Sequence, residues 1–557
     1  MNRASAGRRG GALALFVFPL LMIGVGLVVE RGGLFGQLRR AVQARSIPTG
    51  MLRQGETAKL ARLFEHKIRG GIELEGIDFG LDPRQMPSSL VVPGSPSAPP
   101  RPLLSVVVDE DDLHDPQTGI LARPFKRGMK WERPGYVSFY DAASELRFAS
   151  AVGVRVHGGK SRGHEHKSLR LYFRDLYGTE QFGTGLLFEA GADPIRSLVV
   201  HNDRRVLGRD PARPLWRFMN PLAFDIVRRV GGIAPRTEPV ELLLNGDSVG
   251  PYVLMEHLDE NGLRRLLGVE RLTFGRTRLD SGSDPFRAGD RRAFEKFWDW
   301  PLTAATPLDL DEARARIDVD NLVAWFIGVL YCGTTDPFQG PLVLAGPAEQ
   351  ARWRWVSWDM DHSFMDYYDR VDEAWQIDIF DEVLVRGLLR EKRRAVLLDR
   401  LRQESPEFNA LFVRAMGEAL NHDLSPRFLH ERVAHYARLA GELGAQDLRF
   451  VEDLERYVER RHRALREQLP LYFDSGPARR VEVTGGRMLS IDGRAVRPPY
   501  AGWYFAGAAP RIEALPEDRA ALLRWTVDGR PVSALHPALL REARSIEAVF
   551  AGPRSGG

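Results

Sequence analysis

Residues 152–178 read VGVRVHGGKSRGHEHKSLRLYFRDLYG and carry the clearest fold signal in the first half of the chain. Apolar and polar residues alternate before the glycines and again after Lys167, which is typical of strands. The stretch therefore predicts a strand, a glycine-rich loop and a second strand. In such a loop, backbone amides together with Ser161, Arg162 and Lys167 could surround an anion. An ordinary hairpin with a solvated tip explains the same pattern, and both interpretations stay open.

Two motifs within this stretch resemble catalytic loops, but their surroundings do not fit. Gly159-Lys160-Ser161 lacks the first glycine of a phosphate-binding P-loop, because Val154 occupies that position, and no helix follows. Gly159 to Gly163 also fits the G-x-S-x-G pattern, yet a serine nucleophile there needs a turn from a strand into a helix. Neither kind of enzyme is predicted.

A second constellation is RWRWVSWDMDHSF, residues 352–364. Its alternating start predicts a buried strand, which places Asp359 and Asp361 at the strand end with both carboxylates facing the same way. Two such carboxylates suit a hard cation such as Mg²⁺ or Mn²⁺. A turn in which one aspartate caps the next segment explains the same residues. Asp336, after an apolar helix predicted over 320–330, completes the order in which protein kinases present their aspartates.

Composition indicates a globular chain with more than one folded unit. Its 557 residues are 44% apolar and 27% charged, and a domain usually takes roughly 100 to 200 residues. The 78 basic and 74 acidic residues leave a net charge of +4, which is too small to coat nucleic acid. We therefore expect no nucleic-acid partner.

The N-terminal part predicts a membrane anchor. Residues 10–29 are uncharged and long enough to cross a hydrocarbon core of about 30 Å. They follow a basic tail over 1–9, and no small-residue cleavage site comes soon after them. We expect an uncleaved single-pass helix in a bacterial inner or cell membrane. Arginines on both sides of the segment leave its orientation open on charge. A loose resemblance of the last strands to β-repeats of bacterial surface proteins favours extracytoplasmic C-terminal domains.

The rest of the chain predicts an α+β fold. Residues 30–102 are expected to form a stalk and a Pro/Ser-rich linker. Strand patterns then begin at 103, and helical patterns follow, notably over 212–230 and 426–469. Short strand patterns with turns between them predict a small all-β domain over 478–552.

Several motifs together resemble the CotH-type family of atypical protein kinases over about residues 103–472. They lie in the family's order: Leu104 to Val108, Trp131 to Pro134, Val154 to Arg162, Lys167-Ser168, Tyr177-Gly178, Leu244 to Glu256, and Trp358 to Asp361. The resemblance implies a two-lobed, protein-kinase-like fold. It also implies transfer of phosphate from ATP to Ser or Thr of secreted or coat proteins.

The same resemblance assigns nucleotide-binding roles. Lys167 would hold the ATP phosphates, with Ser161 and Arg162 in the covering loop. Glu256 would lie near the adenine-binding hinge. A helix over 214–230 would pack beside the nucleotide.

It also assigns catalytic and metal-binding roles. Asp336 would position the substrate hydroxyl, and Asp359 would bind Mg²⁺ or Mn²⁺ with help from Asp361. Relatives usually place an asparagine shortly after the first aspartate, whereas this chain has Gln339, whose amide oxygen could take that place.

The resulting expectation is a membrane-anchored, metal-dependent protein kinase that phosphorylates Ser or Thr of an exported or envelope protein. Retention of Lys167, Asp336 and Asp359 favours it. The alternative is a catalytically inactive, kinase-like module that binds a surface or envelope partner, and the missing asparagine favours that one. The sequence names neither the protein substrate nor the oligomeric state.

Overall fold

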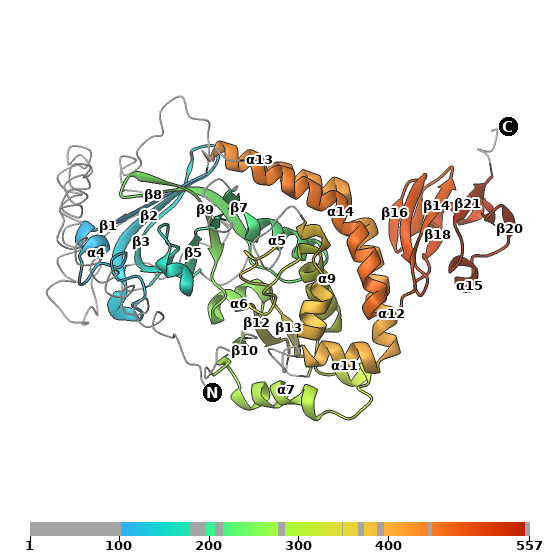
Figure 1. Ribbon diagram of the computed structural model, residues 1–557, viewed down its shortest axis with the longest axis horizontal. Helices are drawn as coiled ribbons and strands as arrows, with labels where there is room; N and C mark the ends of the chain where they lie inside the picture. Colours follow the sequence, from blue (N-terminus) through green and yellow to red (C-terminus); the bar gives the residue numbers. More distant parts are fainter. Residues whose placement is uncertain are drawn as a thin grey trace, which may run out of the picture. The chain divides into compact units, whose positions relative to one another are not determined.

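The computed structural model describes residues 102–174, 177, 195–206, 215–276, 284–347, 349–365, 373–386, 395–443 and 448–551. The expected tail, anchor and stalk, and the linker up to residue 101, lie outside these residues. Strands dominate the first part of the described chain, long helices the middle and short strands the C-terminal part (Figure 1). This mixed content confirms the α+β class.

The expected membrane location is not supported by the structure. Among the described residues, no helix is long and apolar enough to cross a bilayer. The apolar helix α9 (Val319–Cys332) has 14 residues, or about 21 Å at 1.5 Å per residue. The longest helix, α14 (Arg449–Tyr472), carries charged residues along its whole length. Residues 10–29, which suggested a single-pass anchor, lie outside the described residues.

Strands of the first part close into a barrel around a hydrophobic core, seen as the blue to green arrows of Figure 1. In barrel order they are β1 (Leu103–Val108), β2 (Arg133–Tyr140), β3 (Leu146–Val156), β4 (Leu169–Tyr172), β5 (Ser197–His201), β9 (Asp247–Glu256) and β8 (Thr237–Leu244). Runs of β-branched residues such as LLSVVV in β1 favour these strands. Parallel pairing of β1 with β8 closes the barrel, and the other neighbours pair antiparallel.

The side chains of β5 alternate between the barrel core and the larger helical core, so this strand contributes to both. Leu198 and Val200 point into the barrel core, whereas Val199 joins the larger core formed with the helices. Because side chains alternate along a strand, Ser197 and His201 share the outer face with Val199. This outer face becomes one wall of the candidate site.

Helix α9 is the centre of the larger core, and all but one of its residues are buried. The Asp318 side chain caps its first turn by accepting from Asn321 N at 3.0 Å, and Gly333 ends it in the left-handed conformation. Gly328 lies where α9 crosses α5 (Met219–Arg229), and a Cβ there would stand 2.8 Å from Val227 Cγ2. Glycine therefore allows the two helices to approach closely.

A small sheet and further helices complete this part of the chain. The sheet has the order β11 (Phe286–Ala288), β10 (Leu272–Arg276), β12 (Pro341–Ala345) and β13 (Arg352–Trp355). The helices are α4 (Glu110–His114), α6 (Glu260–Leu267), α7 (Arg291–Thr303), α8 (Leu310–Arg314), α11 (Val396–Glu404), α12 (Pro406–Glu418), α13 (Pro426–Glu442) and α14. Among them, α4 packs against the barrel core through Leu113.

The helix expected over 212–230 is shorter than its sequence pattern suggested. The short strand β7 (Leu215–Arg217) precedes it and pairs with β6 (Arg204–Val206), and α5 begins only at Met219. Phe218 at the junction has a left-handed conformation with φ of 58°. The apolar pattern continued through the strand, so it could not show where the helix begins.

Arg461 of α14 holds the C-terminal end of α9. Its side chain is fully buried and donates to the carbonyls of Leu330 and Tyr331, the latter at 3.3 Å. It also donates to the carbonyls of Trp375 and Ile377 at 2.8 and 2.7 Å. A buried guanidinium therefore satisfies carbonyls that a helix end leaves without partners.

The C-terminal part contains short strands around its own hydrophobic cluster, together with the small helix α15 (Pro537–Leu540). The strands are β14 (Ala478–Gly485), β15 (Leu489–Ile491), β16 (Arg494–Val496), β17 (Tyr500–Phe505), β18 (Ile512–Ala514), β19 (Leu522–Val527), β20 (Arg530–Val532) and β21 (Ser545–Phe550). The expected division into a kinase-like domain over 103–472 and an all-β domain over 478–552 stays a prediction.

Candidate functional site

The loop that follows β13 holds the two aspartates predicted to bind metal. Asp359 has a left-handed backbone with φ of 58°, a conformation that aspartate and asparagine tolerate better than most residues. Burial raises the pKa of its carboxyl to about 6, and the charge of Asp361 is the next cause. His201 and His362 oppose this shift, and Asp336 adds to it. The loop therefore concentrates negative charge in a poorly solvated place.

Hydrogen bonds from α5 position this acidic loop. Asn220, in the first turn of α5, is buried, and its Oδ1 accepts from Met360 N at 2.7 Å. Its Nδ2 and backbone N donate to the buried Asp203 at 2.8 and 3.2 Å. Asp203 Oδ1 in turn lies 3.7 Å from Nδ1 of His201 at the end of β5. Strand, helix and loop are thus linked through one amide side chain.

Asp336 and Gln339 reach the same place from the loop after α9. Gln339 Nε2 donates to Asp336 Oδ2. Thr335 N donates to the carbonyl of His362 at 3.2 Å, and the Thr334 and Ser363 hydroxyls lie 2.7 Å apart. The two loops are therefore joined directly, and the structure brings Asp336 and Gln339 together with the Asp359 loop.

The three hairpin residues predicted to surround phosphate make mainly local contacts. Buried Arg162 donates to the carbonyls of Gly158, Pro124 and Lys126 at 2.7, 2.6 and 3.2 Å. Lys167 Nζ donates to the carbonyl of His164 at 3.0 Å, and burial lowers its pKa.

Ser161 packs closely on its own loop. At Gly158, where φ is 108°, a Cβ would stand 2.4 Å from Ser161 Oγ. Among the described residues, the contacts of Ser161, Arg162 and Lys167 do not join these side chains to the acidic loop. Their roles with a nucleotide stay predictions.

Glu256 ends β9 just before α6. Its carboxylate is buried and accepts from Arg265 Nε at 3.2 Å, and that arginine is buried as well. A buried pair of this kind is strongly destabilised when one partner is removed. Glu256 therefore anchors α6 to the barrel, and its expected place near an adenine-binding hinge stays a prediction.

Three histidines on the barrel side were missed in the sequence interpretation. His201 shares its charge environment with Asp359 and Asp361. The rings of His157 and His257 lie 5.5 Å apart, and His257 lies 6.1 Å from Trp358, next to Asp359. Burial lowers the pKa of all three imidazoles, which favours their neutral forms. Alternation along β5 could have placed His201 on the outer face, but no local pattern marks the other two.

The carboxylate oxygens of the acidic loop suit a hard divalent cation. Within the described residues, no group of three or more His, Cys, Asp or Glu side chains is arranged to hold a metal. Asp359 is disfavoured in its charged form by burial and by Asp361. A cation between the two carboxylates would relieve both costs. Asp359 and Asp361 would hold it, with Gln339 Oε1 as a neutral oxygen donor.

Comparison with known proteins identifies the family of the chain. The model of the family described as CotH kinase protein matches residues 154–279 and 289–467. The matched ranges include the hairpin, both aspartate loops and α14 up to Arg461, and they make up more than half of the chain. A search of curated proteins found no match. The chain therefore belongs to the CotH kinase protein family.

Proposed function

We propose that this protein is a metal-dependent kinase that transfers the terminal phosphate of ATP to a Ser or Thr hydroxyl of another protein. The observation that carries the proposal is the meeting of two loops far apart in sequence, one with Asp336 and one with Asp359 and Asp361. Catalysis of phosphoryl transfer depends mainly on positioning and on neutralising charge. Membership of a kinase-like family supports the same chemistry.

Each acidic residue has a separate role in this proposal. A bound Mg²⁺ or Mn²⁺ would neutralise charge on the ATP phosphates. Asp359 and Asp361 hold the cation, and Asn220 fixes the peptide between them. Asp336 accepts the proton of the substrate hydroxyl, and its hydrogen bond from Gln339 orients the carboxylate.

The hairpin supplies the nucleotide side. Lys167 has a half-buried ammonium with one hydrogen bond to a carbonyl, a bond that is readily exchanged for a phosphate oxygen. Ser161 offers a hydroxyl and Glu256 lies at the end of β9. Arg162 shapes the loop through its three carbonyl contacts and leaves the phosphate contact to Lys167.

The alternative is a kinase-like module that binds a partner without transferring phosphate. The local hydrogen bond of Lys167 and the presence of Gln339 in place of asparagine favour it. It requires no metal-dependent nucleotide binding.

A nucleotide titration of the full chain tests the proposal. We expect ATP to bind more tightly with Mn²⁺ or Mg²⁺ than with a chelator, and labelled γ-phosphate to appear on the protein or on added Ser/Thr peptides. ATP binding that is equally tight with a chelator, together with no transfer to any substrate, would favour the binding module.

A further inference from the structure

A basic cavity lies on the outer face of the barrel, beside the candidate site. It has a volume of about 680 Å³ and is lined by residues of β4, the start of β5 and the first turn of α6. Its charged lining consists of Arg170, Arg174, Arg196 and Arg264 with Asp259 and Glu260. Four guanidiniums against two carboxylates give the cavity a positive charge.

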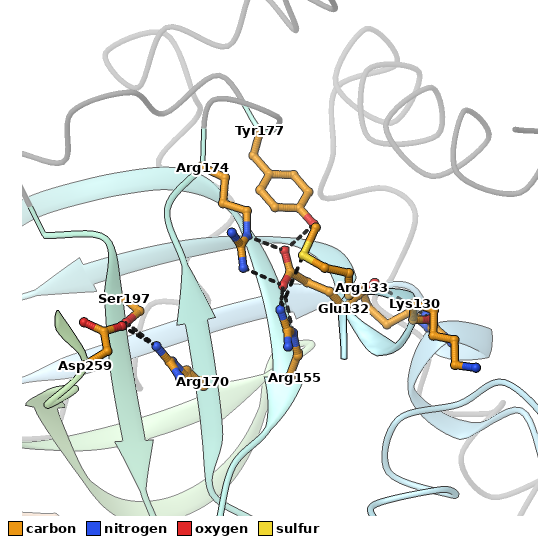
Figure 2. A network of polar contacts seen from close by, with 10 residues as sticks. Lys130, Glu132, Arg133, Arg155, Arg170, Arg174, Tyr177, Ser197 and Asp259 are labelled. Carbon is orange, nitrogen blue, oxygen red and sulfur yellow. Dashed lines mark hydrogen bonds and ion pairs between the residues drawn. The ribbon is translucent and has the colours of Figure 1, made fainter. Parts of the chain in front are cut away.

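Two of its arginines, Arg170 and Arg174, belong with neighbouring Arg155 to a network of polar contacts on the barrel surface (Figure 2). The guanidiniums of Arg155, Arg170 and Arg174 lie 4.2, 4.5 and 4.7 Å from the centre of the Tyr172 ring. Buried Glu132 accepts from Arg155 Nε and Arg174 Nε at 2.8 and 2.9 Å. Three cations around one aromatic ring need such a carboxylate to offset their repulsion.

Close packing maintains this carboxylate in place. Gly153 of β3 lies against Glu132, and a Cβ there would stand 2.4 Å from Glu132 Oε1. Tyr177 Oη donates to the same oxygen at 3.0 Å. The arginine cluster is thus part of the rigid barrel.

Part of the positive charge is not paired with a carboxylate within the described residues. Nε of Arg170 and Nε of Arg264 are buried, and neither has a hydrogen-bond partner within the described ranges. Arg264 donates through NH1 to the Glu270 carbonyl at 3.3 Å, so it faces no carboxylate there. Arg196 is exposed, and no ion pair of its side chain is found in the part of the chain that the structure describes.

Of the two acidic groups of the cavity, Asp259 is already paired. Asp259 accepts from Arg170 and Gly262 N at 2.6 and 3.0 Å. These contacts and its neighbour His257 hold the pKa of Asp259 below its ordinary value. Asp259 therefore stays charged inside the cavity, while Glu260 is exposed at its edge.

The mixed lining decides between two classes of ligand. A polyphosphate offers only acceptors, and the carboxylates of Asp259 and Glu260 would repel it. A peptide brings side-chain carboxylates for the arginines and backbone N–H donors for the acidic groups. A cavity of this size also has room for several peptide residues.

We propose that this cavity docks an acidic segment of the protein substrate, and this inference rests on the proposed kinase function. The cavity adjoins the phosphoryl-transfer site, because Asp259 lies 3.4 Å from His257, whose ring contacts Trp358 beside Asp359. A substrate held there by its carboxylates presents a nearby Ser or Thr hydroxyl to Asp336.

Peptide binding to the full chain without nucleotide tests the docking separately from the chemistry. The probe is a fluorescent peptide with several Asp and Glu residues around one Ser, and the comparison peptide has Asn and Gln in their place. We expect the acidic peptide to bind more tightly, with an affinity that falls as salt rises.

The test variant is the double variant that combines Arg196→Ala with Arg264→Ala. The matched control is Arg427→Ala. Arg427 is 89% exposed on α13 and lies outside the cavity. The double variant should lose about three- to tenfold in affinity for the acidic peptide, as expected for two partly exposed ion pairs. Arg427→Ala should leave the affinity unchanged, and Arg196→Glu should weaken binding further than Arg196→Ala. Melting curves of all variants should coincide.

Three results would overturn the docking site. The first is equal binding of the acidic and neutral peptides, and the second is equal affinity of the double variant and the parent. The third is displacement of the acidic peptide by ATP, which would make the cavity part of the nucleotide site. Failure of phosphate transfer with intact acidic-peptide binding would instead contradict only the kinase chemistry.

Discussion

The hairpin over 157–168 and the acidic loop over 357–364 are held in different ways. In the hairpin, Arg162 and Lys167 donate to carbonyls of their own or a nearby loop. In the acidic loop, Met360 N is held by Asn220, which is 140 positions away in sequence. The hairpin is held within its own loop and by the carbonyls of Pro124 and Lys126, whereas the acidic loop needs β5, α5 and the end of α9. The difference predicts that the two regions respond differently to substitution.

The aspartates should give the largest effects. Asp336→Asn should retain most metal-dependent ATP binding and lower phosphotransfer by about 10²- to 10⁴-fold, because it removes the proton acceptor. Asp359→Asn should lower both, because it removes a metal ligand, while asparagine accepts the same left-handed backbone.

Paired nucleotide titrations and transfer assays check this difference, with melting curves as controls. Two results together would contradict the assignment: both variants bind ATP with metal as tightly as the unsubstituted protein, and the unsubstituted protein itself transfers no phosphate. The acidic loop would then not be the metal site.

The next effect tests the hairpin. Lys167→Ala should weaken ATP binding by about ten- to a hundredfold, the value of one or two charge-assisted hydrogen bonds. Because its contacts are local and half-exposed, the fold should remain intact. Isothermal titration with ATP and Mn²⁺ measures the change.

Lys160→Ala is the matched control, since Lys160 is an exposed lysine of the same loop. Equal affinities of the Lys167 and Lys160 variants would assign the hairpin to the solvated-tip interpretation.

Asn220→Ala tests the long-range support of the acidic loop. It removes the acceptor of Met360 N and the amide donor to Asp203 Oδ1, which should cost about 1 to 3 kcal/mol of unfolding free energy. Metal-dependent ATP binding should fall as well, although Asn220 is not expected to touch the nucleotide. Denaturant unfolding and titration with Mn²⁺ measure the two changes.

Asn421→Ala serves as the control, because Asn421 makes similar backbone hydrogen bonds to Trp503 far from the loop. A normal metal response in the Asn220 variant would show that the loop is self-supporting.

The smallest effect is expected at Glu238, whose carboxyl, like that of Asp359, has a raised pKa. Burial alone raises the pKa of Glu238 on β8 to about 7, whereas Asp361 and Asp336 contribute at Asp359. Since the folded-state pKa exceeds the unfolded value, the contribution of Glu238 to stability is complete below about pH 4.5 and lost as pH rises through about 7.

Glu238→Gln should therefore stabilise the protein at pH 8 by about 1 to 2 kcal/mol, and should change little near pH 4. Thermal unfolding at both pH values measures this. A variant that is equally stable at pH 8 would place Glu238 in a better solvated position.

Local patterns predicted much of the fold and less of the site. The strand pattern predicted to begin at residue 103 is confirmed by β1 (Leu103–Val108), which is rich in β-branched residues. The apolar run after Asp320 likewise indicated α9. The family resemblance from 103 to 472 is supported by the match over 154–467.

Features made by distant contacts could not be read in the same way. Nothing near Asn220 or Asp203 in sequence indicates that they meet beside Met360. The hairpin contacts of Arg162 depend on carbonyls more than 30 positions earlier in the chain. The membrane location was wrong for the described residues because it was inferred from a segment outside them.

The buried arginine at the end of α9 has a consequence for the order in which the chain matures on the ribosome. Arg461 is made 125 residues after Asp336, yet it holds the helix end that leads into the Asp336 loop. A nascent chain that stops before α14 has all the acidic residues of the site but not the side chain that holds this helix end. Termination anywhere upstream of residue 461 should therefore yield a fragment in which the Asp336 loop is not held in its place.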